Sequence, residues 1–171
     1  LARGVAALRR TPRAGRRLAT VAVGVSGGVD SAVAALMLKR QGHDVVGIHV
    51  TSWDEADEGG AERCQDAERR DAQRVCEHLG IGFHEIRLVS EYWHSVFEPL
   101  VSGYASLATP NPDLDCNRHI KFDALMRHAL DLGAEALATG HYARLHHQPD
   151  APTLLLAGVD ASKDQSYFLA T

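Results

Sequence analysis

The chain has 171 residues, of which 45% are hydrophobic and 23% are charged, and this composition and length are typical of one globular domain. No apolar stretch approaches the roughly 20 residues that a membrane-spanning helix requires, so we expect no membrane anchor. Three cysteines at wide spacing indicate neither a disulfide framework nor a zinc knuckle.

Positive charge is concentrated at the start of the chain. Residues 1–20 hold six arginines and no acidic residue, as in a transit peptide, so we expect a mitochondrial protein, with a plastid or cytoplasmic location as alternatives. A disordered basic arm that contacts nucleic acid is the other interpretation. Residues 21–171 hold 12 Lys and Arg against 22 Asp and Glu, a formal net charge of −10, so most contacts to a polyanionic partner would have to lie elsewhere.

Strands and helices are predicted to alternate along the rest of the chain. Hydrophobic periodicity and helix-ending glycines predict strands at 19–25, 44–50, 83–88 and 136–139, and helices at 31–41, 62–79, 91–104 and 116–132. A polar loop at 146–152 is expected to lead to a short strand at 153–157. This order predicts an α/β fold with a mostly parallel twisted sheet, helices on both faces and a ligand at the carboxyl ends of the strands.

The turn after the first predicted strand has the sequence SGGVDS, residues 26–31. A strand, a glycine-rich turn and a helix form an anion site because backbone N–H groups and the helix N-terminus point to one place. Asp30 stands where a Walker A loop has lysine, and the G-x-G-x-x-G pattern is absent. Since a carboxylate beside phosphates needs a divalent cation, we expect Asp30 to bind Mg²⁺ at a pyrophosphate group. A Gly-Gly turn with Asp30 as a helix cap is the simpler alternative.

Cys116 follows a proline-rich segment at 108–115 and is predicted to lie at the N-terminus of a helix. The helix dipole, together with Arg118, His119 and Lys121, would lower the pKa of its thiol, which is the environment of a nucleophile. The alternative is a small buried side chain under a rigid turn, the usual environment of a lone cysteine.

Two later segments offer further contacts. Gly140, at the end of the last predicted strand of the sheet, allows a ligand close to the backbone, and His141 can donate to a phosphate or base, although a structural pair with Tyr142 is the simpler interpretation. Ser162 and Gln165 fit a capping box, so a helix is expected to begin there.

Four motifs in this order, SGGVDS, TPNPD-x-x-CN-x-x-IKF, ATGHYAR and SKDQSYFL, closely resemble those of the tRNA-specific 2-thiouridylases of the PP-loop ATP pyrophosphatase superfamily. The resemblance runs from about residue 21 to 170, and the basic start resembles the mitochondrial form. It implies an adenine nucleotide alpha hydrolase-like fold, with residues 1–20 as a leader and 21–171 as the N-terminal PP-loop catalytic domain. The central and C-terminal tRNA-binding domains are expected outside this chain.

The resemblance also implies an activity, that of a tRNA-uridine 2-sulfurtransferase. Such an enzyme uses ATP and Mg²⁺ to adenylate the C2 oxygen of the wobble uridine, U34, of tRNA, and a persulfide supplied by a sulfur donor or carrier protein then delivers sulfur. The cysteine matched by Cys116 is one of two catalytic cysteines and helps to release the sulfur or resolves a disulfide. The persulfide cysteine is expected beyond Thr171, because neither Cys64 nor Cys76 occupies its place.

The site residues follow by matching positions of the motifs. The catalytic positions are matched by Cys116, Asp30 and Asp113. The ATP-binding positions are matched by Gly24, Val25, Ser26, Gly27, Gly28, Val29, Asp30, Ser31, Val50 and Gly140, and Val50 stands where the family commonly has Met. The positions that contact the target base and the tRNA in the family are matched by Asn111, Pro112, Asp113, His141, Lys163, Asp164 and Gln165.

Two alternatives stay open. Another adenylating enzyme of the superfamily, of the synthetase type, would share SGG-x-D-S but should lack the cluster at 111–116. Without the second cysteine, the chain would instead be a truncated fragment that binds ATP or tRNA without turnover.

Overall fold

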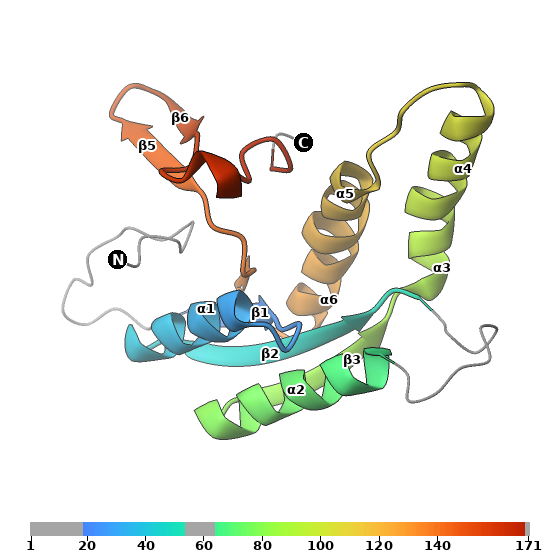
Figure 1. Cartoon of the computed structure of the whole chain (residues 1–171). Coiled ribbons are helices and arrows are strands. Elements are labelled where there is room, and N and C mark those ends of the chain that lie inside the picture. The colour runs from blue at the N-terminus through green and yellow to red at the C-terminus, as the bar shows by residue number, and fades with distance from the viewer. Residues whose placement is uncertain (1–18, 54–63, 170–171) are drawn as a thin grey trace.

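The computed structural model describes residues 19–53 and 64–169. The predicted leader therefore lies almost wholly outside the described residues. A parallel four-stranded sheet in the order β3-β2-β1-β4 forms the centre of the molecule (Figure 1). Its strands are β1 (Thr20–Gly24), β2 (Asp44–Thr51), β3 (Gly82–Arg87) and β4 (Ala136–Ala138).

Helices follow the strands as the sequence predicted. The first two are α1 (Val29–Arg40) and α2 (Cys64–Leu79). A longer run after β3 contains α3 (Val89–Tyr92), the π-helix η2 (Trp93–Phe97) and α4 (Glu98–Ala105). The last run contains α5 (Pro112–Asp115), the π-helix η3 (Cys116–Ala124) and α6 (Leu125–Asp131).

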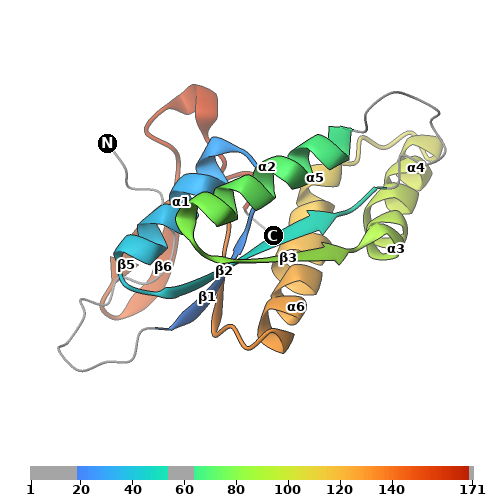
Figure 2. The same cartoon turned by 90° about the horizontal axis from the view of Figure 1, so that it is seen from below.

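The two faces of the sheet are covered by different helices because side chains alternate along a strand. Val21 and Val23 of β1 pack with Leu38 of α1 on one face. Ala22 packs with Leu125 of α6 on the opposite face. Seen from below, α1 and α2 lie side by side on their face of the sheet (Figure 2). The predicted parallel sheet with helices on both faces is confirmed.

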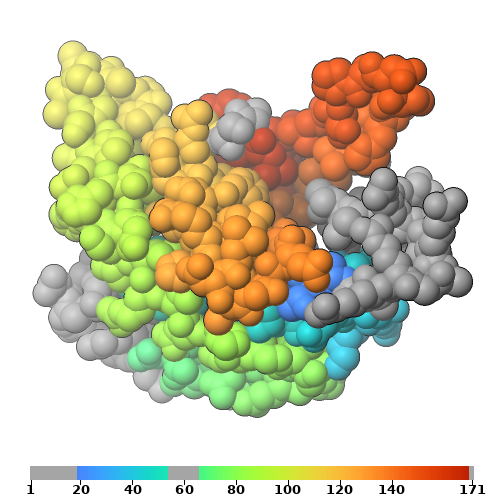
Figure 3. All heavy atoms as spheres, turned by 180° about the vertical axis from the view of Figure 1, so that it is seen from behind, coloured from blue at the N-terminus to red at the C-terminus, as the bar shows by residue number. Residues whose placement is uncertain are grey.

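The predicted polar loop at 146–152 is wrong. Strands β5 (Arg144–Gln148) and β6 (Ala151–Leu156) form an antiparallel hairpin in which Arg144 pairs with Leu156. The polar sequence RLHHQ has no alternation of apolar residues, because both faces of this ribbon are largely exposed, and periodicity therefore gave no strand. From behind, the hairpin and the end of α4 form two projections on either side of η3 (Figure 3).

The predicted capping box at Ser162 and Gln165 is also wrong. The short 3₁₀-helix η4 (Ala161–Lys163) is capped by Asp160, whose carboxylate accepts from the backbone N–H of Ser162 at 2.9 Å. Gln165 instead accepts from the backbone N–H of Tyr142 at 2.9 Å. Within residues 19–53 and 64–169, no helix has the length and apolar character that crossing a membrane would require.

Candidate functional site

The SGGVDS turn is closed by its two serines. Ser31 Oγ donates to the carbonyl oxygen of Gly28 at 3.1 Å and accepts from the backbone N–H of Ser26 at 3.3 Å. The N–H of Gly28 donates to Ser26 Oγ at 3.3 Å. Gly28 is the N-cap of α1 and supplies no capping side chain, so the N–H groups of the first turn are left for an anion. The alternative in which Asp30 caps this helix is therefore wrong.

Two glycines hold this turn against its neighbours. Gly27 has a φ of +83°, and a Cβ added there would lie 2.9 Å from the Cβ of Asp71 in α2. A Cβ added to Gly140 would lie 2.7 Å from the backbone nitrogen of Ser31. Only glycine permits these two approaches, so both residues shape the turn through backbone contact.

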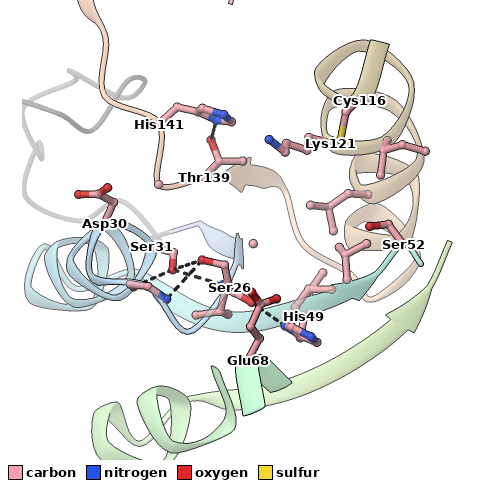
Figure 4. Close-up of a pocket in the computed structure, with 18 of the residues that line it drawn as sticks. Ser26, Asp30, Ser31, His49, Ser52, Glu68, Cys116, Lys121, Thr139 and His141 are labelled. Carbon is pink, nitrogen blue, oxygen red and sulfur yellow. Dashed lines mark hydrogen bonds between the residues drawn. The ribbon is translucent and has the colours of Figure 1, made fainter. Parts of the chain in front are cut away.

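The carboxyl ends of β1, β2 and β4 meet at a cavity of about 360 Å³ (Figure 4). It is bounded by the SGGVDS turn, the end of β2, the start of α2, the η3 helix and the segment after β4. Of the residues that the motifs singled out, the following line it: Gly24, Val25, Ser26, Gly28, Val29, Asp30, Ser31, Val50, Cys116, Gly140 and His141.

The other predicted residues lie outside the cavity wall. Asn111 caps α5, since its side-chain oxygen accepts from the N–H of Asp113 at 3.0 Å, and Pro112 occupies the first turn. Asp164 accepts from the N–H groups of Gly158 at 2.9 Å and Ser166 at 3.0 Å, which organise its own loop.

Lys163 is the exposed last residue of η4. Gln165, through its bond to Tyr142, connects this C-terminal segment to the segment after β4 that borders the cavity. The C-terminal motif is therefore next to the cavity and does not form its wall.

The predicted environment of Cys116 needs correction. The helix begins at Pro112, so Cys116 lies one turn inside it and not at its N-terminus. Burial raises the pKa of the Cys116 thiol; Lys121 opposes that shift and Asp113 adds to it. The side chain packs against the apolar cluster that contains Ile120. Cys116 is a free thiol with a raised pKa, where the sequence predicted a lowered one.

The cavity also contains polar residues to which the sequence reasoning gave no role. Thr139 Oγ1 lies 2.8 Å from His141 Nδ1, and burial, followed by the charge of Lys121, lowers the pKa of His141. This contact with Thr139 replaces the expected pair of His141 with Tyr142. Thr139 is the last residue of the strand predicted at 136–139, at the edge of the sheet where the ligand was expected, and this position is the sequence signal that could have indicated it.

Buried His49 supports the turn from β2. Its Nδ1 lies 3.0 Å from the carbonyl oxygen of Val25, so this ring nitrogen donates and fixes the last residue before the turn. Glu68, from α2, lines the same side of the cavity, and Lys121 lines the opposite side. Among the described residues, no group of three His, Cys, Asp or Glu side chains is placed to hold a metal ion.

Comparison with known proteins agrees with the four motifs. Residues 19–171 match the family model described as "tRNA methyl transferase HUP domain". A protein of Lactiplantibacillus plantarum named "tRNA-specific 2-thiouridylase MnmA" is 50% identical over 151 residues, which are 88% of this chain and 40% of that protein. A protein of the same name from Alkaliphilus oremlandii is 51% identical over 150 residues, which are 87% of this chain and 40% of that protein. The chain thus spans about 40% of the length of these curated relatives.

Among solved structures, "The crystal structure of predicted subunit of tRNA methyltransferase from Methanocaldococcus jannaschii DSM" aligns with a TM-score of 0.49 and 16% identity, over 85% of this chain and 60% of that one. The family match covers residues 19–171, and the relatives carry the name that the motifs predicted. This chain therefore belongs to the tRNA methyl transferase HUP domain family and is similar within it to the tRNA-specific 2-thiouridylases.

Proposed function

We propose that this chain is the ATP-binding domain of an enzyme that replaces the C2 oxygen of the wobble uridine of tRNA with sulfur. The observation that carries the proposal is the cavity in which the SGGVDS turn and Cys116 face one space. An anion site beside a thiol suits a reaction that activates an oxygen with a nucleotide and then uses sulfur. The relatives' printed name, tRNA-specific 2-thiouridylase, supports the same activity.

ATP is proposed to lie with its pyrophosphate on the SGGVDS turn. The uncapped first turn of α1 provides N–H donors for phosphate oxygens, and apolar Ile48 and Val50 at the end of β2 provide a surface for the adenine ring. The cavity volume of about 360 Å³ lies within the usual range of small-molecule sites.

Mg²⁺ fits this arrangement if the phosphates supply most of its ligands. No described cluster of three ligating side chains exists, and Asp30 is a single carboxylate at the cavity on the first turn of α1. Mg²⁺ is commonly held by one or two carboxylates together with substrate phosphates and waters. Asp30 would hold it, and the ion would neutralise charge between the carboxylate and the pyrophosphate.

The proposed reaction has two stages. The C2 oxygen of uridine attacks the α-phosphate of ATP, the bond to the β-phosphate breaks, and pyrophosphate leaves. The terminal sulfur of a cysteine persulfide then attacks C2, and AMP leaves with the oxygen. Cys116 as thiolate attacks the inner sulfur, the sulfur–sulfur bond breaks, and 2-thiouridine is released while Cys116 forms a disulfide that a thiol reductant reopens.

The remaining site residues are proposed to serve the RNA. Asp113 and the Asn111–Pro112 turn precede Cys116 on the same helical run, where they can meet the target base. His141 borders the cavity, and Lys163, Asp164 and Gln165 belong to the neighbouring C-terminal segment, where tRNA is proposed to bind. A persulfide donor or carrier protein is the second proposed partner.

Organisation and location belong to the same proposal. Residues 1–20 are proposed to direct the protein to mitochondria, because they carry six arginines and no acidic residue. Residues 21–171 are proposed to be the catalytic PP-loop domain of a protein whose further domains grip the tRNA, in keeping with the acidic charge of this domain and its coverage of 40% of its relatives.

The test is a thiolation assay with the protein that carries this chain. With tRNA, ATP, Mg²⁺ and a persulfide donor, the wild type should produce thiolated tRNA that is retarded on a mercury-affinity gel. Cys116→Ser should produce none. Cys76→Ser is the matched control, since Cys76 is a buried free thiol that does not line the cavity. Full activity of the Cys116→Ser protein would refute the role of Cys116.

A further inference from the structure

The cavity has an unbalanced distribution of charge for a site that takes ATP. The SGGVDS turn contains no lysine, and the acidic residues Asp30 and Glu68 both line the cavity. Among the described residues that line it, Lys121 is the only lysine or arginine. A polyphosphate that enters such a site needs a positive partner besides backbone N–H groups, because like charges repel strongly where water is partly excluded.

The π-helix η3 gives Lys121 its position. A π-helix pairs residue i with residue i+5, so Cys116 and Lys121, five residues apart, lie on one side of η3 and both line the cavity. In Figure 4 the ammonium of Lys121 extends from η3 toward Thr139 and His141, on the far side of the cavity from Glu68. Among the described residues, no side chain or carbonyl is a hydrogen-bond or salt-bridge partner of the Lys121 ammonium, so its three donors are available to a ligand.

The charge of Lys121 also acts on two other residues at the cavity. It lowers the pKa of His141, after the larger effect of burial, and it opposes the burial that raises the pKa of the Cys116 thiol. Both effects need the ammonium to be close to these groups, which agrees with the view in Figure 4.

We propose that Lys121 is the phosphate-binding cation of this cavity and pairs with the phosphate chain of the bound nucleotide from the wall opposite the SGGVDS turn. The inference rests on the proposed function, because it requires ATP in the cavity. Lys121 takes the role that lysine has in a Walker A loop, but from a distant helix, and the turn itself can therefore carry Asp30 for the metal ion. The phosphate chain would then be held between two elements, with its reacting end directed to the side of Cys116.

The experiment measures binding of MgATP and of adenosine to the purified protein by calorimetry. The variants are Lys121→Met, Lys121→Arg and Arg118→Met, and the last removes an exposed cation from the same helix outside the cavity. We expect Lys121→Met to weaken MgATP binding by about tenfold or more and to leave adenosine binding unchanged, because only the phosphates meet the ammonium. Lys121→Arg should recover most of the affinity, and Arg118→Met should bind both ligands as the wild type does.

Each outcome decides the inference. MgATP binding by Lys121→Met at the wild-type level would overturn it, and so would an equal loss of MgATP and adenosine binding, which would show that Lys121 supports the cavity as a whole and not the phosphates in particular. If Arg118→Met lost as much MgATP affinity as Lys121→Met, the inference would be overturned, because the net charge of the protein would then explain the effect without a contact from Lys121. If the wild type binds neither MgATP nor adenosine, the proposed function fails together with the inference; if it binds both and Lys121→Met does too, only the inference fails.

Discussion

Gly140 lies directly against Ser31, so that a Cβ atom on Gly140 would lie 2.7 Å from the Ser31 backbone nitrogen. Gly140 follows β4 and Ser31 is in the first turn of α1, and the two segments form adjoining parts of the cavity wall. The contact is made by backbone atoms, which cannot move aside as a flexible side chain can. The geometry of the proposed phosphate site therefore depends on a residue more than a hundred positions along the chain.

Gly140→Ala is expected to displace the start of α1 and to weaken MgATP binding by about tenfold, with a loss of about 1–3 kcal/mol in the free energy of unfolding, as is usual for overpacking. Calorimetry and urea unfolding measure the two effects. Gly82→Ala is the control, since a Cβ there would lie 3.4 Å from a methyl group of Val46 and meet no backbone. Unchanged MgATP binding in Gly140→Ala would show that the close approach is not needed.

The reactivity of Cys116 should depend on two charges of opposite sign. Burial raises the pKa of its thiol, Asp113 raises it further and Lys121 lowers it; the phenol of Tyr92 packs in the same cluster. The thiolate is the reactive form, so alkylation should accelerate as the pH rises through a pKa above the ordinary value of a thiol. Lys121→Met should move the midpoint to higher pH, and Asp113→Asn should move it to lower pH.

The measurement is the rate of iodoacetamide alkylation of Cys116 against pH, read by mass spectrometry of the peptide. Buried Cys76, whose pKa is also raised by burial, serves as an internal reference that neither substitution should affect. Midpoints that shift in the same direction in both variants would contradict the electrostatic account.

Asp30→Ala is expected to reduce the gain in ATP affinity that Mg²⁺ provides. The wild type should bind ATP more tightly with Mg²⁺ than without it, because Asp30 would help to hold the ion and the ion would neutralise the charge of the phosphates. Asp30→Ala should lose most of that difference, and the control Asp66→Ala, which removes an exposed acidic residue from the first turn of α2, should keep it. Equal enhancement by Mg²⁺ in Asp30→Ala and the wild type would exclude Asp30 as a ligand.

Asn117 ties the C-terminal segment to η3. Its Nδ2 donates to the carbonyl oxygen of Phe168 at 2.7 Å, and the residue is 1% exposed. Asn117→Ala should lower the free energy of unfolding by about 1–3 kcal/mol, because a partly buried carbonyl loses its donor. It should also speed proteolytic cleavage within residues 158–169. Cleavage at the wild-type rate would show that other contacts hold this segment.

The sheet could be predicted because its strands are apolar and the helices between them end at glycines, as at Gly42, Gly80 and Gly133, all with positive φ. Of the β5–β6 hairpin, the strand predicted at 153–157 overlaps β6, but β5 could not be predicted because it is polar and exposed. The π-helical geometry of Cys116–Ala124 could not be predicted either, because hydrophobic periodicity was compared only with the 3.6-residue repeat of an α-helix.

The candidate site, like the fold, was predicted only in part. The SGGVDS turn and Gly140 were singled out because a motif marks each of them, and Val50 because of its position at the end of a strand; residues of all three segments line the cavity. The raised pKa of Cys116 was missed because the sequence did not place the helix start at Pro112, and because burial is a property of the packed fold. Lys121 was predicted only to act on the Cys116 thiol and not as a ligand-binding residue, because its place at the cavity wall depends on η3.

Residues 1–20 are expected to direct a fused fluorescent reporter to mitochondria, because they combine six arginines with an absence of acidic side chains. Replacing the six arginines by glutamine should abolish import. The measurement is the overlap of the reporter with a mitochondrial stain. Uniform cytosolic fluorescence of the unmodified fusion would refute the location.

The most direct test of the account is the release of pyrophosphate from ATP in the presence of tRNA, measured together with 2-thiouridine formation in the protein that carries this chain. The account predicts that the wild type forms both products and that Cys116→Ser still releases pyrophosphate but forms no 2-thiouridine, because the SGGVDS cavity adenylates and Cys116 acts afterwards. A wild type that releases no pyrophosphate with tRNA and a persulfide donor present would contradict it.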